Sequence, residues 1–103
     1  MLRPGSTAAQ DVRIEAVFAA AATEDRIRGH LLNADAPGRQ EILNVLLPRL
    51  FQLNREQFGD SAGIAATLAA LEGAVRAADA AAAWEAFLAL AERPGPNFGT
   101  WAI

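Results

Sequence analysis

The most regular hydrophobic pattern in the chain lies within residues 61–92. Its large apolar side chains recur at every third or fourth position, which places them on one face of an α-helix. They are Ile64, Leu68, Leu71 and Val75. Alanine fills most positions between them, and alanine is the strongest helix former because ordering it costs no side-chain entropy. Ser61 precedes the pattern and is predicted to cap the helix N-terminus.

A second apolar group in the same stretch is out of phase with the first. Its members are Trp84, Phe87, Leu88 and Leu90. At about 100° per residue, they would lie on the opposite side of a continued helix. We therefore predict a break near Ala78–Asp79, with Asp79 capping a second helix that folds back as an αα-hairpin. The alternative is one long helix that buries different faces, but a helix over all of residues 61–92 is long for a small domain.

The N-terminal third predicts two shorter helices. Thr7 and Gln10 have the spacing of a capping box, which starts a first helix over about residues 8–22. Thr23, followed by two acidic residues, is predicted to cap a second helix that ends near Asn33. The predicted inward residues are Ile14, Val17, Phe18 and Ala21 in the first helix, and Ile27 and Leu31 in the second.

The central third is the most apolar part of the chain. A helix is predicted from Pro37, which fits a first turn, to about Phe58, ahead of Gly59. Its large apolar residues cover more than one face, so we expect it at the centre of the core. They are Ile42, Leu43, Val45, Leu46, Leu47, Leu50, Phe51 and Leu53. Pro48 cannot donate a hydrogen bond to the Asn44 carbonyl, so it must kink the helix or split it in two.

Together these patterns predict an all-α fold, a compact bundle of four to five helices with the αα-hairpin at residues 61–92. A chain of 103 residues fits one domain. We divide it into a disordered lead at 1–6, a helical domain at 7–93 and an extended apolar tail at 94–103. No apolar run approaches the length of a membrane span and no stretch has the pattern of a signal peptide, so we expect no membrane contact and a cytoplasmic protein.

The composition gives a reason to expect self-association. Alanine is the most frequent residue and all nine basic residues are arginine, a bacterial-like composition typical of GC-rich genomes. Small side chains let helices approach closely but fill little core volume, so such a domain often completes its core against a second copy or another protein. The net charge of −3 disfavours nucleic acid as a partner, because phosphate-backbone binders carry a basic field.

No pattern in the sequence predicts catalysis, a metal or a cofactor. The chain has no cysteine, and its single histidine, His30, is not part of a metal-ligand spacing. We therefore expect a solvated histidine on a helix surface. The acidic residues do not cluster into a pair for acid–base work. Ser61 lies in FGDSAG, which resembles the D-S-L attachment site of acyl carrier proteins, but Ala62 replaces the leucine and a helix-capping serine accounts for the same residues.

A helix-turn-helix is an alternative interpretation of residues 23–58. Four basic side chains flank a turn that contains Gly38, and they are Arg26, Arg28, His30 and Arg39. A recognition helix exposes polar residues to the DNA bases, whereas the helix from Pro37 is apolar on most faces. We expect these arginines instead to pair with nearby acids, which are Glu24, Asp25 and Glu41.

The C-terminal tail carries the clearest sign of binding. Phe98, Trp101 and Ile103 follow a Pro-Gly-Pro spacer, and exposing each of them costs about 1.5–3 kcal/mol relative to burial. They must dock onto the chain's own helices, for example near Trp84 or Phe18, or onto a second copy or another protein as an extended peptide. We predict that the partner-binding residues are Phe98, Trp101, Ile103 and Trp84, because tryptophan is a favoured interface anchor.

These observations favour a non-catalytic protein–protein interaction module, an adaptor or accessory protein that forms a homodimer. The alternative is a helical bundle that binds or converts a small molecule in an apolar pocket lined by Trp84, Phe87 and Phe51. The interaction module is preferred because catalysis generally needs converging titratable groups, which the sequence does not indicate.

Overall fold

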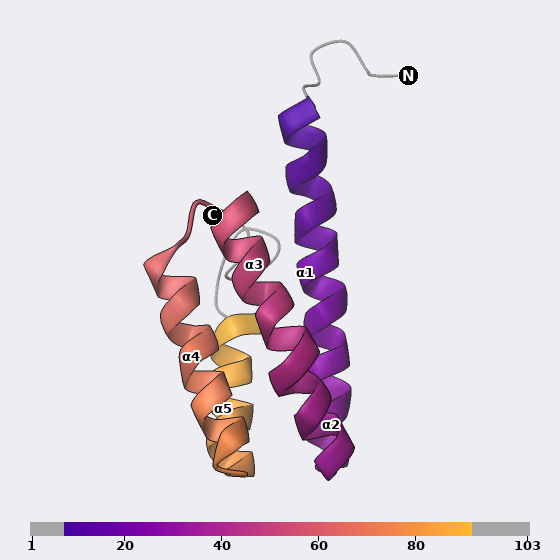
Figure 1. The fold of residues 1–103 in the computed structure, drawn as a ribbon, viewed down its shortest axis with the longest axis vertical. Coiled ribbons are helices and arrows are strands. Elements are labelled where there is room, and N and C mark those ends of the chain that lie inside the picture. Colours follow the sequence, from indigo (N-terminus) through magenta and orange to yellow (C-terminus); the bar gives the residue numbers. More distant parts are fainter. Residues whose placement is uncertain (1–7, 92–103) are drawn as a thin grey trace.

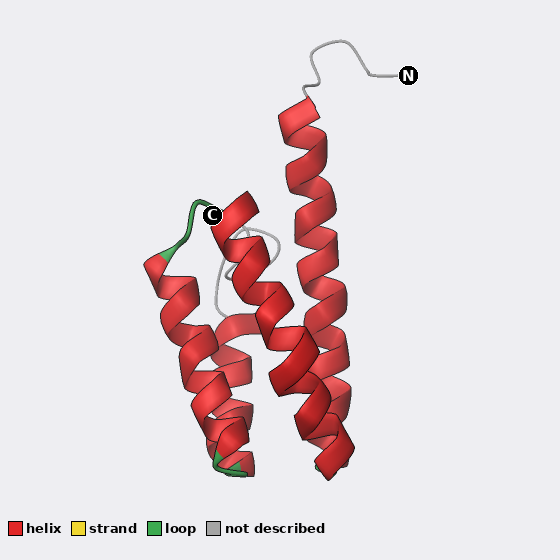
Figure 2. Cartoon of the chain, in the orientation of Figure 1, coloured by secondary structure: helices red, strands yellow, loops and turns green. Residues whose placement is uncertain are grey.

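The computed structural model describes the backbone of residues 8–91 and the side chains of residues 15–91, and it shows an all-α bundle (Figure 1). Its elements are α1 (Ala8–Asn33), α2 (Ala36–Glu41), the π-helical segment η1 (Ile42–Leu46), α3 (Leu47–Gln57), α4 (Ala62–Arg76) and α5 (Ala80–Ala91). Because α2, η1 and α3 follow one another without a loop, the described residues form four helical rods joined by short connections (Figure 2). This confirms the predicted fold class. None of the helices in this part of the chain combines the length and the hydropathy that a membrane crossing needs.

α1 is one helix of 26 residues, about 39 Å long, where the sequence predicted two. The predicted cap at Thr23 is wrong. Thr23 is buried, and its Oγ1 donates a hydrogen bond to the Ala19 carbonyl, one turn earlier, at 2.8 Å. A hydroxyl that bonds in this way is satisfied inside a continuous helix. Ala16, Ala20 and Ile27 are buried on one face that continues past Thr23, so the packing requires no break.

Phe18 is the second correction in α1. The sequence predicted an inward side chain, but Phe18 is 60% exposed. The inward face is set by Ile27, which is fully buried together with Ala20. Once the two predicted helices form one rod, about 100° per residue places Phe18 on the side opposite Ile27. Leu31 packs partly buried against the core, as predicted.

The rod from Ala36 to Gln57 contains the predicted irregularity at Pro48. The Leu47 N–H donates to the Ile42 carbonyl, five residues earlier, so the turn ahead of the proline is π-helical. The wider turn accommodates a residue that cannot donate to the carbonyl four residues back. Pro48 then lies in the first turn of α3, where its missing N–H is tolerated. The rod contributes a large part of the core, as expected, with the buried residues Ile42, Leu46, Leu47, Leu50 and Asn54.

α4 and α5 form the predicted αα-hairpin and contact each other more extensively than any other pair of elements. Both predicted caps are confirmed. Ser61 Oγ accepts a hydrogen bond from the Ile64 N–H at 3.3 Å, and Asp79 Oδ1 accepts one from the Ala82 N–H at 3.1 Å. The buried residues of the hairpin are Ile64, Thr67, Leu68, Leu71, Val75, Ala83, Phe87 and Leu90. They include all of the first predicted stripe.

The loop between α3 and α4 is held by Asn54, which is fully buried. Its Nδ2 donates to the Ser61 carbonyl and its Oδ1 accepts from the Ser61 N–H, both at 3.1 Å. The Asn54 carbonyl accepts from the Asp60 N–H at 2.8 Å. Gly59 has a φ of 72°, a conformation that favours glycine. These bonds satisfy buried polar groups and fix where α4 starts relative to α3.

Candidate functional site

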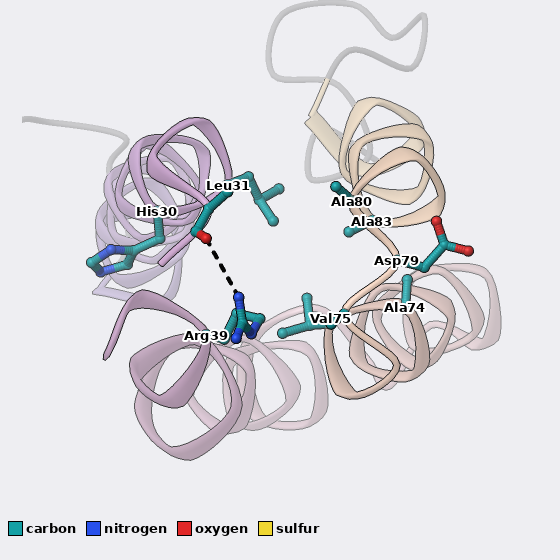
Figure 3. Close-up of a pocket in the computed structure, with 10 residues that line it drawn as sticks. His30, Leu31, Arg39, Ala74, Val75, Asp79, Ala80 and Ala83 are labelled. Carbon is teal, nitrogen blue, oxygen red and sulfur yellow. Dashed lines mark hydrogen bonds between the residues drawn. The ribbon is translucent and has the colours of Figure 1, made fainter. Parts of the chain in front are cut away.

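The described residues form a pocket at the end of the bundle where two helix–helix turns meet (Figure 3). One turn joins α1 to α2 and the other joins α4 to α5. The pocket has a volume of about 150 Å³. α1 contributes His30 and Leu31, α2 contributes Arg39, and the hairpin contributes Val75, Asp79 and several alanines. Most of its lining is therefore apolar, with one guanidinium among the aliphatic side chains.

Arg39 is the charged group that faces this pocket. In Figure 3 its side chain lies between Leu31 and Val75. Its Nη1 donates to the Ala34 carbonyl at 3.4 Å, which is long for a hydrogen bond. Within residues 15–91, no carboxylate lies within ion-pair distance of this guanidinium. Arg39 therefore keeps most of its N–H donors for water or a ligand.

Two alanines in a left-handed backbone conformation line the pocket. Ala34 and Ala78 each have a φ of 54°. Both follow the end of a helix: the Ala34 N–H donates to the His30 carbonyl at 2.9 Å, and the Ala78 N–H donates to the Val75 carbonyl at 3.1 Å. Glycine is usual at such positions because a Cβ there costs about 1–2 kcal/mol. Both turns that form the pocket therefore contain backbone strain.

The other ionisable side chains of the lining are engaged elsewhere. His30 points away from the pocket in Figure 3, and its Nε2 donates to Glu41 Oε2. Arg26 Nε donates to Glu41 Oε1 at 2.6 Å. The hydrogen bond from Arg26, together with that from His30, holds the pKa of the Glu41 carboxyl below its usual range, although burial acts in the opposite direction. The expectation of a solvated histidine is wrong, because this side chain is only 22% exposed.

Two of the expected arginine pairs are confirmed. Arg26 binds Glu41, and Arg28 Nη1 lies 3.6 Å from Asp25 Oδ1. The Arg28 guanidinium also lies 5.3 Å from the centre of the Phe87 ring, a cation–π contact that links α1 to α5. These contacts give Arg26 and Arg28 structural roles.

The structure describes one of the four predicted partner-binding residues. Trp84 is half-buried on α5 and packs against the core, with its ring centre 5.6 Å from that of Phe87. Phe98, Trp101 and Ile103 lie outside the described residues. The cis or trans docking of the tail therefore stays a prediction.

The predicted lining of a small-molecule pocket does not match the pocket observed. Phe87 is fully buried in the core, while Trp84 and Phe51 pack against that core. None of the three lines the pocket between the turns. The sequence predicted Arg39 as a possible DNA contact or as the partner of a nearby acid, and the second prediction is wrong, because no ion pair within residues 15–91 includes Arg39. The hydrophobic pattern of the sequence predicts both turns. It does not predict that the two turns lie side by side, because that contact depends on tertiary packing.

The outward face of α1 is a second candidate surface. Leu32 is 69% exposed and Phe18 is 60% exposed, although large apolar residues are usually buried. Ala22, Asp25 and Gly29 lie between them and are also exposed. These five residues recur at every third or fourth position, which is the spacing of a helix–helix seam. Figure 1 also shows that the first turns of α1 extend beyond the ends of α3 and α4.

Within the described part of the chain, no group of three or more histidine, cysteine, aspartate or glutamate side chains is arranged to hold a metal ion. Comparisons with known proteins give no match to a family model, to a curated protein or to a solved structure. The function is therefore inferred from the geometry of the pocket and of the α1 face.

Proposed function

We propose that the chain is a non-catalytic interaction module that pairs with a second copy of itself through the outward face of α1. The observation that carries this proposal is the 69% exposure of Leu32 on a face with seam spacing. Burying such a side chain in an interface is favourable by about 1.5–3 kcal/mol. The proposal includes a cytoplasmic location.

A second copy fits this face because large and small residues alternate along it. In an antiparallel pair of α1 helices, Phe18 of one copy can lie opposite Gly29 of the other. No neighbouring side chain lies within 4 Å of the position that a Cβ on Gly29 would occupy, so there is room for a ring. The same register places Ala22 opposite Asp25, where a small side chain allows close approach of the two backbones. It also places Leu32 opposite the exposed Glu15, whose two methylene groups can pack against the leucine.

The charges on the face also complement one another in this register. Asp25 is 76% exposed in its side chain, and Arg26 is 62% exposed. Arg26 follows Ala22 by one helical turn. Its hydrogen bond to Glu41 uses only Nε, so the Nη groups of Arg26 in the second copy can approach Asp25. An ion pair of this kind contributes little affinity at a surface, but it selects the antiparallel orientation.

Sedimentation velocity over micromolar to millimolar protein concentration tests self-association. We expect the wild-type chain to dimerise, and we expect Leu32→Glu to weaken the dimer by about tenfold or more, because it buries a charge in place of an apolar group. Ala69→Glu is the matched control, since it adds the same charge at an exposed position of α4. A wild-type chain that stays monomeric throughout, or an equal effect of the two substitutions, would contradict the proposal.

The apolar tail belongs to the same proposal, as a segment that docks on its own chain or on the partner. Trp101→Ala in the full-length chain distinguishes the two arrangements. A weaker dimer with unchanged folding stability would place Trp101 against the second copy. A lower free energy of unfolding with unchanged dimerisation would place it on its own chain.

Small-molecule binding is a second candidate function, and one observation favours it. The pocket between the two turns combines apolar walls with the guanidinium of Arg39, which has no ion-pair partner within residues 15–91. Ligand sites are commonly concave, mostly apolar and provided with a few oriented polar groups.

A further inference from the structure

The pocket between the α1–α2 turn and the α4–α5 turn combines two features that together define a class of ligand. We propose that it binds a small monocarboxylate with a short branched or aromatic apolar part, held by Arg39. This inference rests on the second candidate function, and it is independent of self-association through α1.

The first feature is the state of the Arg39 guanidinium. Within residues 15–91, its one hydrogen bond is the 3.4 Å contact with the Ala34 carbonyl, drawn as the dashed line in Figure 3. The fixed fork of a guanidinium matches the two oxygens of a carboxylate and binds them in a bidentate manner. Because the side chain is half-buried between Leu31 and Val75, the pair would be only partly screened by water.

The carboxylates nearest to the pocket do not compete for this guanidinium. Asp79 points away from Arg39 in Figure 3, and its Oδ1 accepts the Ala82 N–H at the start of α5. Glu41 is held by Arg26 and His30. Asp35 Oδ1 accepts the Gly38 N–H at 2.9 Å and caps α2. Each acid therefore has a structural partner, and the positive charge of Arg39 is left for a ligand.

The second feature is the size and polarity of the remaining lining. Leu31, Ala74, Val75, Ala80 and Ala83 form aliphatic walls around a volume of about 150 Å³. An engineered protein cavity of about this volume binds benzene. The space therefore fits an apolar group no larger than a benzene ring. A nucleotide or a sugar phosphate is disfavoured, because an aliphatic wall offers few donors for a dianion.

Titration of the ¹⁵N-labelled full-length chain with isovalerate, followed by ¹H–¹⁵N NMR, tests the site. We expect saturable shifts confined to amides of the two turns, with a dissociation constant in the millimolar range for so small a ligand. Isovaleramide has the same shape without the charge, and we expect it to bind about tenfold more weakly or worse. Arg39→Gln should produce a similar loss for isovalerate. Arg49→Gln is the matched control, because Arg49 is an exposed arginine of α3 outside the pocket.

Three results would overturn the proposal. Equal affinity for isovalerate and isovaleramide would mean that the cavity takes apolar groups without regard to charge. Equal weakening by Arg39→Gln and Arg49→Gln would mean that the net charge of the protein attracts the anion. Shifts that do not saturate would mean that there is no site. The comparison of acid and amide uses the wild-type chain, so it tests whether the site requires a carboxylate even if Arg39→Gln fails to fold. A monomeric chain that binds isovalerate would contradict the α1 interface and leave this site intact.

Discussion

The middle of α1 and the turn between α4 and α5 contain the same kind of sequence signal, a residue with N-cap chemistry within an alanine-rich stretch. At Asp79 the chain breaks, and the carboxylate accepts the Ala82 N–H. At Thr23 the helix continues, and the hydroxyl donates back to the Ala19 carbonyl. A capping side chain therefore permits a helix start but does not impose one.

The apolar pattern around each residue explains the difference. In the hairpin, the stripe that ends at Val75 is out of phase with Trp84 and Phe87, so a continued helix would expose one group or the other. Around Thr23, the buried residues Ala20 and Ile27 lie on one face. A single rod buries them without a turn, and ending the helix would leave backbone groups unpaired. The phase of the apolar stripe therefore determines whether the helix ends, and a capping residue stabilises the new helix only where the stripe requires a break.

The largest expected effect comes from placing proline at Thr23 or at Ala80, the residue that follows Asp79. Thr23→Pro should lower the free energy of unfolding by about 3 kcal/mol or more, because it removes an internal hydrogen bond and clashes with the carbonyl one turn earlier. Ala80→Pro should change it by less than about 0.5 kcal/mol, because the first position of a helix tolerates proline. Urea denaturation of both variants measures the two values. Equal losses would contradict the assignment of Thr23 to a helix interior.

The same physical reasoning separates what the sequence could predict from what it could not. The hairpin, its Ser61 and Asp79 caps and the disruption at Pro48 follow from local patterns, and the structure confirms them. The inward prediction for Phe18 follows only if residues 8–22 form a separate helix. In one continuous helix, the phase of Ile27 places Phe18 outward and requires no break at Thr23.

The candidate site was predictable only in part. The turn near Asp35 and the break near Asp79 can be recognised in the sequence, and Arg39 follows the first of them. That the two turns form one pocket depends on how α1 packs against the hairpin, including the contact between Arg28 and Phe87. No local pattern encodes that contact, because the two residues are far apart in the chain.

The strained alanines of the two turns allow a test of smaller effect. Ala78→Gly should raise the free energy of unfolding by about 0.5–1 kcal/mol, because glycine adopts a positive φ without the penalty of a Cβ. Ala69→Gly, at an exposed interior position of α4, should lower it by about 0.5–1 kcal/mol. Thermal and urea unfolding of both variants checks the opposite signs. A loss at both positions would show that the left-handed conformation of Ala78 is not a source of strain.

The smallest expected effect distinguishes the two turns by their dependence on pH. Glu41 on α2 accepts hydrogen bonds from Arg26 and His30 on α1 and so stabilises the α1–α2 turn. The pKa of Glu41 is lowered from 4.5 chiefly by the hydrogen bond from Arg26. A carboxyl with a lower pKa in the folded state adds stability above its unfolded pKa, and this stability is lost as the pH falls through the folded value. Glu41→Gln should therefore destabilise the protein at neutral pH and make its stability less dependent on pH below about 4.5.

Glu85→Gln is the control, because Glu85 is exposed and forms no ion pair within residues 15–91. In urea unfolding across this pH range, Glu85→Gln should follow the wild-type profile. An unchanged acid profile for Glu41→Gln would mean that the contacts with Arg26 and His30 do not stabilise the α1–α2 turn, which would then depend on its backbone caps as the α4–α5 turn does.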